Sequence, residues 1–113
     1  MKKQLLTIVL ILFSLVGSSQ AYYHQFVDSV IKTFENASGE KEIIETHKEG
    51  LPYLLEVSPD TVVHFAKKGA IAASKLGDKE SKIWFVLIIG DAYNQLANYT
   101  EALEYLIEAA EMA

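Results

Sequence analysis

The sequence predicts an all-α fold, and three observations support this class. No segment shows the alternation of apolar and polar residues that a half-buried strand requires. Apolar residues instead recur at helical spacing, most clearly over residues 83–113. Short polar, Gly- and Pro-containing stretches at 36–39, 58–60, 77–78 and 98–100 divide the chain into segments of helical length. We therefore expect an N-terminal helix followed by two helix pairs.

Residues 1–21 have the composition of a targeting segment. Two lysines follow Met1, an apolar run covers 5–16, and Ser19 and Ala21 are the small residues that a signal peptidase needs. The run is shorter than the roughly 20 residues that span a membrane. We expect cleavage after Ala21 and a periplasmic or secreted mature protein. The alternative is an uncleaved leader that anchors the chain.

The composition after the leader excludes several classes of partner. Residues 22–113 contain eight lysines against fifteen acidic residues, a net charge of −7, and the chain has neither arginine nor cysteine. Arginine is the favoured residue for phosphate and base recognition, so an acidic chain without it is a poor nucleic-acid or anionic-lipid binder. The absence of cysteine excludes disulfides and thiolate metal sites. We expect no nucleic-acid partner, no cofactor and no membrane span apart from the leader.

The first helix is expected over 22–36 and should form a cap over 22–39. Phe26, Val30 and Phe34 recur at four-residue spacing, and Gly39 follows as a residue that tolerates a left-handed stop.

The first helix pair is expected over 40–79. Its first helix spans 40–57 and contains Pro52, which should kink or break the helix near 50–52 because proline lacks a backbone donor. Ser58-Pro59 is typical of a helix start, and the second helix should run from there to residue 76.

The second helix pair is expected over 80–113, with a polar turn at 98–100. Its small residues fall where two helices must approach closely: Gly90 on one helix, Ala102 and Ala109 on the other. The predicted packing faces are Val86, Ile89, Gly90, Tyr93 and Leu96 on the first helix, and Ala102, Tyr105, Leu106 and Ala109 on the second.

This second pair resembles a tetratricopeptide repeat (TPR). Ile89-Gly90 and Tyr93 match the Leu-Gly and Tyr positions of the family pattern, and Ala102 and Leu106 match its Ala and Phe positions. Val86 stands at the Trp position, whereas the only tryptophan, Trp84, lies two residues earlier. The resemblance implies a short right-handed TPR-like α-solenoid that binds a protein or peptide.

A repeat should recur, and a shift of 40 residues places Gly50 on Gly90 and Tyr53 on Tyr93. The same shift places Gly69 on Ala109. We therefore expect TPR-like repeats over 40–79 and 80–113. The residues predicted to pack the repeats are Gly50, Tyr53, Gly69, Gly90, Tyr93, Ala102 and Ala109.

No catalytic or metal-binding motif is recognisable. His24, His47 and His64 lack the spacing of metal-binding histidine motifs, and the chain has neither a phosphate-binding loop nor a nucleophile elbow. We therefore expect neither an enzyme nor a metal site.

The resemblance implies that the first helix of each pair lines a concave groove. In the second repeat the groove-facing residues would be Trp84, Leu87, Asp91, Asn94 and Gln95. In the first they would be Ile44, His47 and Leu51. Trp84 and Asn94 could supply an aromatic anchor and an amide clamp for a peptide, although Trp84 could equally pack on the preceding helix.

The leader, the linker Leu-Gly-Asp-Lys-Glu at 76–80 and the order of elements resemble the start of TPR-containing bacterial sensor histidine kinases and helix-turn-helix regulators. This predicts the N-terminal part of a signalling protein. The alternative is a complete small exported scaffold. Leu103, Ile107 and Ala110 remain free for a neighbour, so the last helix should be continued, capped or joined to a second copy as a homodimer.

Overall fold

The computed structural model describes residues 4–8 and 20–113, and all secondary structure in these ranges is helical. Residues 4–8 are helical, and the longer helices are α2 (Gln20–Glu35), α3 (Glu40–Leu54), α4 (Pro59–Leu76), α5 (Lys79–Gln95) and α6 (Tyr99–Met112). The predicted all-α class is confirmed. Ser19 and most of the predicted leader lie outside the described residues. None of the helices described is long and apolar enough to cross a membrane.

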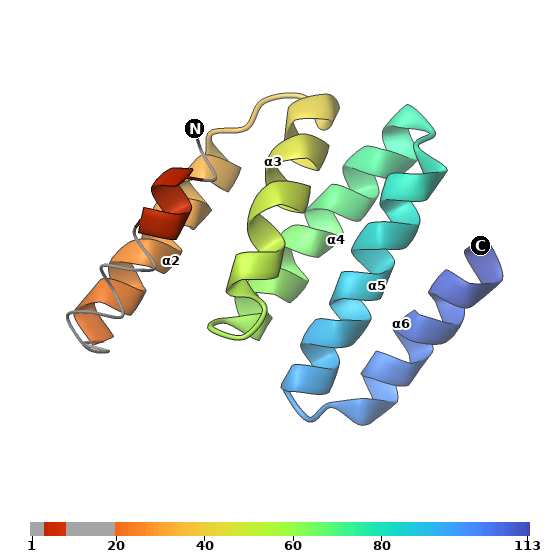
Figure 1. The fold of residues 1–113 in the computed structure, drawn as a ribbon. Coiled ribbons are helices and arrows are strands. Elements are labelled where there is room, and N and C mark those ends of the chain that lie inside the picture. The colour runs from red at the N-terminus through yellow and green to blue at the C-terminus, as the bar shows by residue number, and fades with distance from the viewer. Residues whose placement is uncertain (1–3, 9–19) are drawn as a thin grey trace.

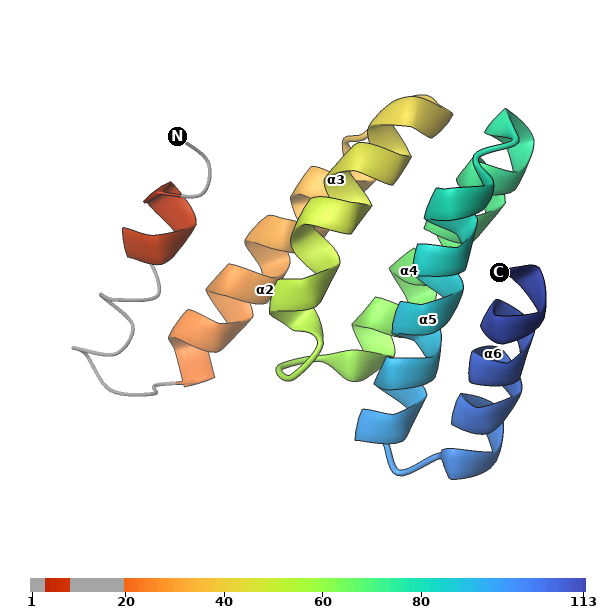
Figure 2. The ribbon, with the colours of Figure 1, turned by 45° about the vertical axis from the view of Figure 1, so that its right-hand side comes forward.

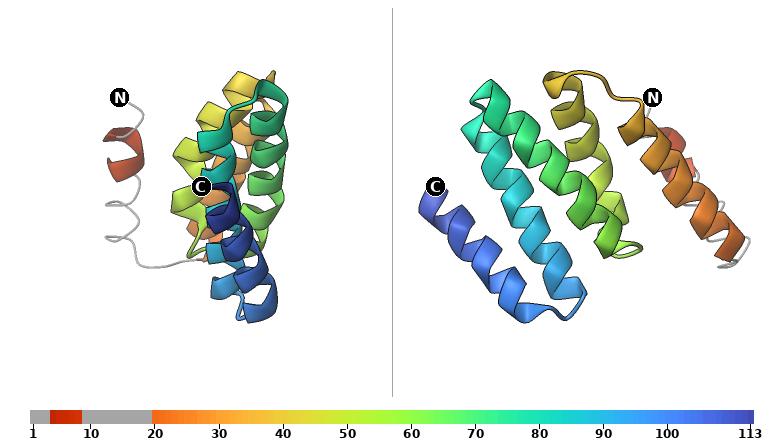
Figure 3. Two further views of the ribbon diagram at one scale, coloured as in Figure 1. Left: turned by 90° about the vertical axis from the view of Figure 1, so that its right-hand side faces the viewer. Right: turned by 180° about the vertical axis from the view of Figure 1, so that it is seen from behind.

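Consecutive helices from α2 to α6 run antiparallel, so α3 and α5 point in the same direction (Figure 1). These two helices lie on the same side of α4 (Figure 2), and the side view in Figure 3 separates them from α4 as one layer from another. Each helix packs mainly on its neighbours in the chain, with α4 contacting both α3 and α5. The arrangement leaves one side of α3 and α5 without a covering helix among the residues described.

The helix boundaries follow the predicted start and stop signals. Ser58 precedes α4 with Pro59 in its first turn, and Gly77 ends α4 in the left-handed conformation at φ 68°. The Gly77 N–H donates to the Ser74 carbonyl (3.2 Å) and the next N–H to the Ala73 carbonyl (2.9 Å). This pair of hydrogen bonds is the Schellman motif. Glycine is favoured at its left-handed position because glycine has no Cβ.

The same motif ends α5, but an alanine occupies the left-handed position. Ala97 has φ 57°, its N–H donates to the Asn94 carbonyl (3.0 Å), and the Asn98 N–H donates to the Tyr93 carbonyl (2.9 Å). A left-handed conformation costs an L-residue with a Cβ about 1–2 kcal/mol. The turn at 98–100 was predicted, whereas the strained residue before it was not.

Of the kink or break predicted near 50–52, the break is absent. α3 is continuous through Pro52 and ends at Leu54. Proline removes a single backbone donor, and Pro52 lies in the last turn of the helix, so the loss of one bond there leaves the preceding turns intact.

The core lies between α4 and the α3–α5 layer. Phe34, the last large side chain of α2, closes it from one end. Gly69 allows α4 to approach α5 closely, because a Cβ at this position would overlap with the Phe85 ring. The most deeply buried large apolar side chains are Phe34, Leu51, Leu54, Val62, Phe85 and Ile89.

The internal repeat has a different register from the one predicted. A 40-residue shift does relate α4 to α6, where Val62 and Ala102 are both buried, as are Gly69 and Ala109. For the first helices of the pairs the matching shift is 38 residues. It places the buried His47, Leu51 and Leu54 on the buried Phe85, Ile89 and Ala92.

A difference of two residues turns the aligned face of a helix by about 200°, or about 160° in the opposite sense, because successive residues lie about 100° apart. The predicted equivalence of Gly50 with Gly90 is therefore wrong, and Pro52 occupies the position of Gly90.

Candidate functional site

His47 does not line a groove, contrary to the prediction. Its side chain is 0% exposed and stacks on Phe34 of α2, with ring centroids 4.4 Å apart. Phe65 of α4 meets it edge-on at 5.6 Å. Ile44 and Leu51, assigned to the same groove, are also buried. The cause is the rotation of α3, which turns this side toward α2 and α4.

The buried imidazole of His47 is held neutral. Its Nδ1 lies 3.0 Å from the Thr46 hydroxyl, whereas its Nε2 has no hydrogen-bond partner in the part of the chain that is described. Burial, reinforced by the positive charge of Lys68, lowers the pKa of His47 from 6.5 to about 4. A neutral histidine packed between two phenylalanines is a core residue whose charging would oppose folding.

The predicted groove residues of α5 lie together on its uncovered side. Leu87 is 42% exposed, and Asp91, Asn94 and Gln95 are exposed as well. The three polar side chains have no hydrogen-bond or ion-pair partner within residues 4–8 and 20–113. They are therefore available to an external ligand.

Trp84 packs against its neighbours, and its role as a peptide anchor stays a prediction. The indole is partly buried and meets the Phe85 ring edge-on at 5.2 Å. Its other contact is with Lys48 of α3, whose Nζ lies 5.8 Å from the ring centroid in a cation–π arrangement. The tryptophan thus packs between two helices while part of its ring stays accessible.

Lys48 lies beside Trp84, and the sequence reasoning missed this contact. Its Nζ donates to the Ser81 hydroxyl (3.3 Å), so one side chain joins α3 both to Trp84 and to the first turn of α5. Ser81 in turn donates its backbone N–H to the Asp78 carboxylate (3.1 Å), the N-cap of α5. The hydrogen bonds from Ser81, with a smaller contribution from Lys48, lower the pKa of Asp78. The sequence does not state how α3 is rotated about its axis. Without that rotation, Lys48 cannot be told from its neighbour His47 as the residue at this site.

The corrected register places a second row of side chains on the uncovered side of α3. Glu49, Tyr53 and Glu56 stand 38 residues before Leu87, Asp91 and Asn94, and all six are exposed. Tyr53 is 36% exposed, so its assignment as a packing residue is wrong. We call this surface the α3–α5 face. It consists of Glu49, Tyr53, Glu56, Leu87, Asp91 and Asn94, with Lys48 and Trp84 between the two helices.

Most of the residues predicted to pack the second helix pair lie at the contact of α5 with α6, whereas Leu96 is 44% exposed and its assignment to the packing face is wrong. A Cβ at Gly90 would lie 2.8 Å from Leu106 Cδ2 and 3.4 Å from the Ala102 carbonyl oxygen. Tyr93 stacks on Tyr105 at 5.5 Å, and Ala102 and Ala109 are buried.

Gly50 differs from these residues. A Cβ there would meet Phe34, so it serves the contact with α2 and not a contact within its own pair.

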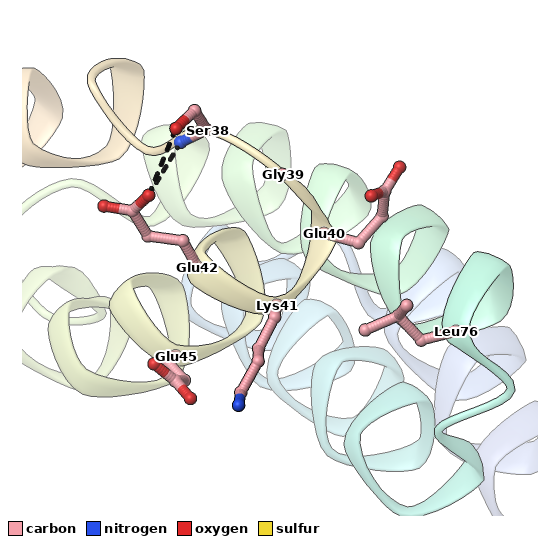
Figure 4. Close-up of a pocket in the computed structure, with 7 residues that line it drawn as sticks. All are labelled: Ser38, Gly39, Glu40, Lys41, Glu42, Glu45 and Leu76. Carbon is pink, nitrogen blue, oxygen red and sulfur yellow. Dashed lines mark hydrogen bonds between the residues drawn. The ribbon is translucent and has the colours of Figure 1, made fainter.

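A shallow hollow lies at the start of α3. It is lined by Ser38, Glu40, Glu42, Glu45 and neighbouring residues (Figure 4). Glu42 accepts hydrogen bonds from the backbone N–H (3.1 Å) and hydroxyl (3.3 Å) of Ser38, and Glu40 pairs with Lys75 at 4.0 Å. Glu42 thus bonds to the α2–α3 connection, whereas Glu40 joins the start of α3 to α4. In the described part of the chain, no three His, Cys, Asp or Glu side chains converge on a metal site.

Comparison of the sequence and structure with protein-family models, curated proteins and solved structures finds no significant match.

Proposed function

We propose that this chain is a protein- or peptide-binding module of the TPR type, exported from the cell, whose α3–α5 face is the recognition surface. In this proposal α2 to α6 form a short right-handed α-solenoid, and α3 and α5 provide its inner layer. The observation that carries the proposal is the pairing of two parallel helices that present aromatic, apolar and unpaired polar side chains on one uncovered side.

The chemistry of the face favours an extended or helical polypeptide. Tyr53, Trp84 and Leu87 supply apolar area, which carries most of the binding energy at interfaces. Asn94 can both donate to and accept from a peptide backbone, and Asp91 with Glu49 and Glu56 favours ligands that carry lysine or arginine. Lys48 links α3 to α5 and both helices pack on α4, which favours a face that is organised before the ligand arrives.

The resemblance to the start of bacterial sensor kinases and regulators supports a place for the module ahead of a membrane span and an output domain. On that basis we propose a signalling role in which ligand binding outside the cytoplasm is the input.

Selection of peptides tests the recognition surface. A display library of random peptides is panned against the immobilised full chain, and the enriched peptides are then measured against three variants. Leu87→Ser and Tyr53→Ser each remove an exposed apolar side chain from the face, and we expect each to weaken binding about tenfold or more, the usual loss for one anchor residue. Ile71→Ser is the matched control, because Ile71 is 58% exposed on α4.

Enriched peptides that bind all three variants like the parent would place recognition elsewhere. If Ile71→Ser alone weakened binding, the recognition surface would be on α4 and the proposal would be wrong.

A further inference from the structure

The last helix, α6, carries a second surface that the α3–α5 face does not include. Leu103 is 59% exposed, Ile107 48% and Leu106 37%, and Ala110 is exposed beside them. We call these four residues the α6 stripe. Leu103, Ile107 and Ala110 follow one another at four- and three-residue spacing, so they form one continuous line along the helix. The line lies on the outer helix at the C-terminal edge of the molecule (Figure 1).

The α6 stripe has two different borders. On one side Ala102 and Ala109 are buried, with Ala102 against Gly90 of α5. On the other side Glu104, Glu108 and Glu111 repeat the spacing of the stripe one residue later, which places them about 100° further around the helix. All three glutamates are exposed, and none has a hydrogen-bond or ion-pair partner among residues 4–8 and 20–113. The apolar line therefore has one acidic edge.

Charge along this part of the chain has one sign. Residues 83–113 contain five carboxylates and no lysine, arginine or histidine. A ligand on the stripe meets carboxylates that no basic side chain of α6 neutralises.

An antiparallel second copy of this chain fits the stripe poorly. When two antiparallel helices are related by a two-fold axis, corresponding edges meet on the same side, so the glutamates of one copy would face those of the other. Within α2 to α6, the helix that carries the most lysines beside an exposed apolar residue is α4, around Ile71. Its lysines are engaged: Lys67 with the Tyr93 hydroxyl (3.4 Å), Lys68 over the Phe65 ring (5.6 Å) and Lys75 with Glu40 (4.0 Å).

We propose that the α6 stripe binds an amphipathic helix of another protein, one whose apolar side is flanked on one edge by lysine or arginine. Its apolar residues cover Leu103, Ile107 and Leu106, the small Ala110 permits close approach, and its basic edge pairs with Glu104, Glu108 and Glu111. This rests on the proposed binding function but uses a different surface, so the two can fail separately.

Two synthetic helical peptides test the proposal against the full chain. They share one leucine and alanine stripe and differ only in its flank, which carries lysines in one peptide and glutamates in the other. Fluorescence anisotropy should show binding of the lysine peptide at least about tenfold tighter, since three exposed ion pairs supply about that factor. Salt at about 0.5 M should remove most of this difference by screening.

Reversing the charges of the α6 glutamates is the decisive experiment. The triple variant Glu104→Lys, Glu108→Lys, Glu111→Lys should prefer the glutamate peptide. The control triple Asp28→Lys, Glu35→Lys, Glu45→Lys makes the same change in net charge at exposed positions of α2 and α3 and should keep the lysine preference. Leu103→Ser with Ile107→Ser should weaken binding of the lysine peptide more than tenfold while far-UV circular dichroism stays helical.

Four results would overturn the proposal. The peptides could bind equally, or the control triple could change the preference as much as the α6 triple does. If Leu87→Ser no longer bound the lysine peptide while the variant with Leu103→Ser and Ile107→Ser still bound it, the peptide would lie on the α3–α5 face. A chain that sediments as a dimer, and becomes monomeric in the double serine variant, would show that a second copy covers the stripe.

Discussion

Acid should destabilise the fold through one residue, His47. The native protein keeps this imidazole neutral down to about pH 4, whereas the unfolded chain protonates it near 6.5. Because the native pKa is lowered, the stabilising effect of the neutral form is fully present above pH 6.5 and is lost as the pH falls from 6.5 to 4. A difference of this size corresponds to about 3 kcal/mol, of which about 2 kcal/mol is lost by pH 5.

Urea unfolding of residues 22–113, followed by circular dichroism and by Trp84 fluorescence at pH 7, 6 and 5, measures this loss. His47→Phe is the matched variant, because α5 carries Phe85 at the corresponding position, and His47→Leu is a smaller alternative if phenylalanine does not fit. Neither can titrate. The pKa of Asp78 is lowered, so the pH dependence of stability that this group contributes falls below the ordinary aspartate range and outside the interval from pH 7 to 5.

We expect the free energy of unfolding of the parent to fall by about 2 kcal/mol between pH 7 and 5, and that of either variant to change much less. Parallel pH profiles for the parent and both variants would refute the argument. Histidine at position 47 would then not be buried as a neutral side chain between Phe34 and Phe65.

Four further predictions follow from the helix contacts, the left-handed turn and the leader. Gly69→Ala should destabilise more than Gly90→Ala in thermal melts, because the new Cβ meets the rigid Phe85 ring at one site and the movable end of Leu106 at the other. Gly90→Leu and Ala102→Leu should each cost on the order of 1–3 kcal/mol by overpacking, and melting like the parent would contradict the α5–α6 contact. Ala97→Gly should raise the free energy of unfolding by up to about 1 kcal/mol, since glycine adopts φ 57° without a Cβ clash; a loss of stability would contradict this. Mass spectrometry of exported protein should find an N-terminus at Tyr22, whereas an intact Met1 in the membrane fraction would favour the anchor.

The sequence predicted the helices well because their ends carry local signals. Ser58-Pro59 starts α4 and Gly77 ends it, and both signals act through backbone geometry that neighbouring residues determine. The sides of α5 and α6 were also predictable, since Gly90 and Ala102 are small where the two helices meet.

The rotation of α3 could not be predicted in the same way. Gly50 and Tyr53 match Gly90 and Tyr93 in type, yet the structure aligns the two helices two residues away from that match. In the observed rotation His47 packs against Phe34, and this contact joins two helices that no sequence pattern links. For that reason the prediction placed His47 on the surface and overlooked Lys48. Ala97 escaped notice because alanine gives no signal of a left-handed turn.

Site-specific photocrosslinking tests the central claim, that the α3–α5 face binds a protein partner. A photoreactive phenylalanine analogue is placed at Tyr53, at Leu87 or at Ile71 of the chain expressed in its own host. The first two positions lie on the face, and Ile71 is exposed on α4. The account predicts a discrete crosslinked species at positions 53 and 87 and none at 71. Equal labelling at all three positions, or a discrete species at 71 alone, would contradict it.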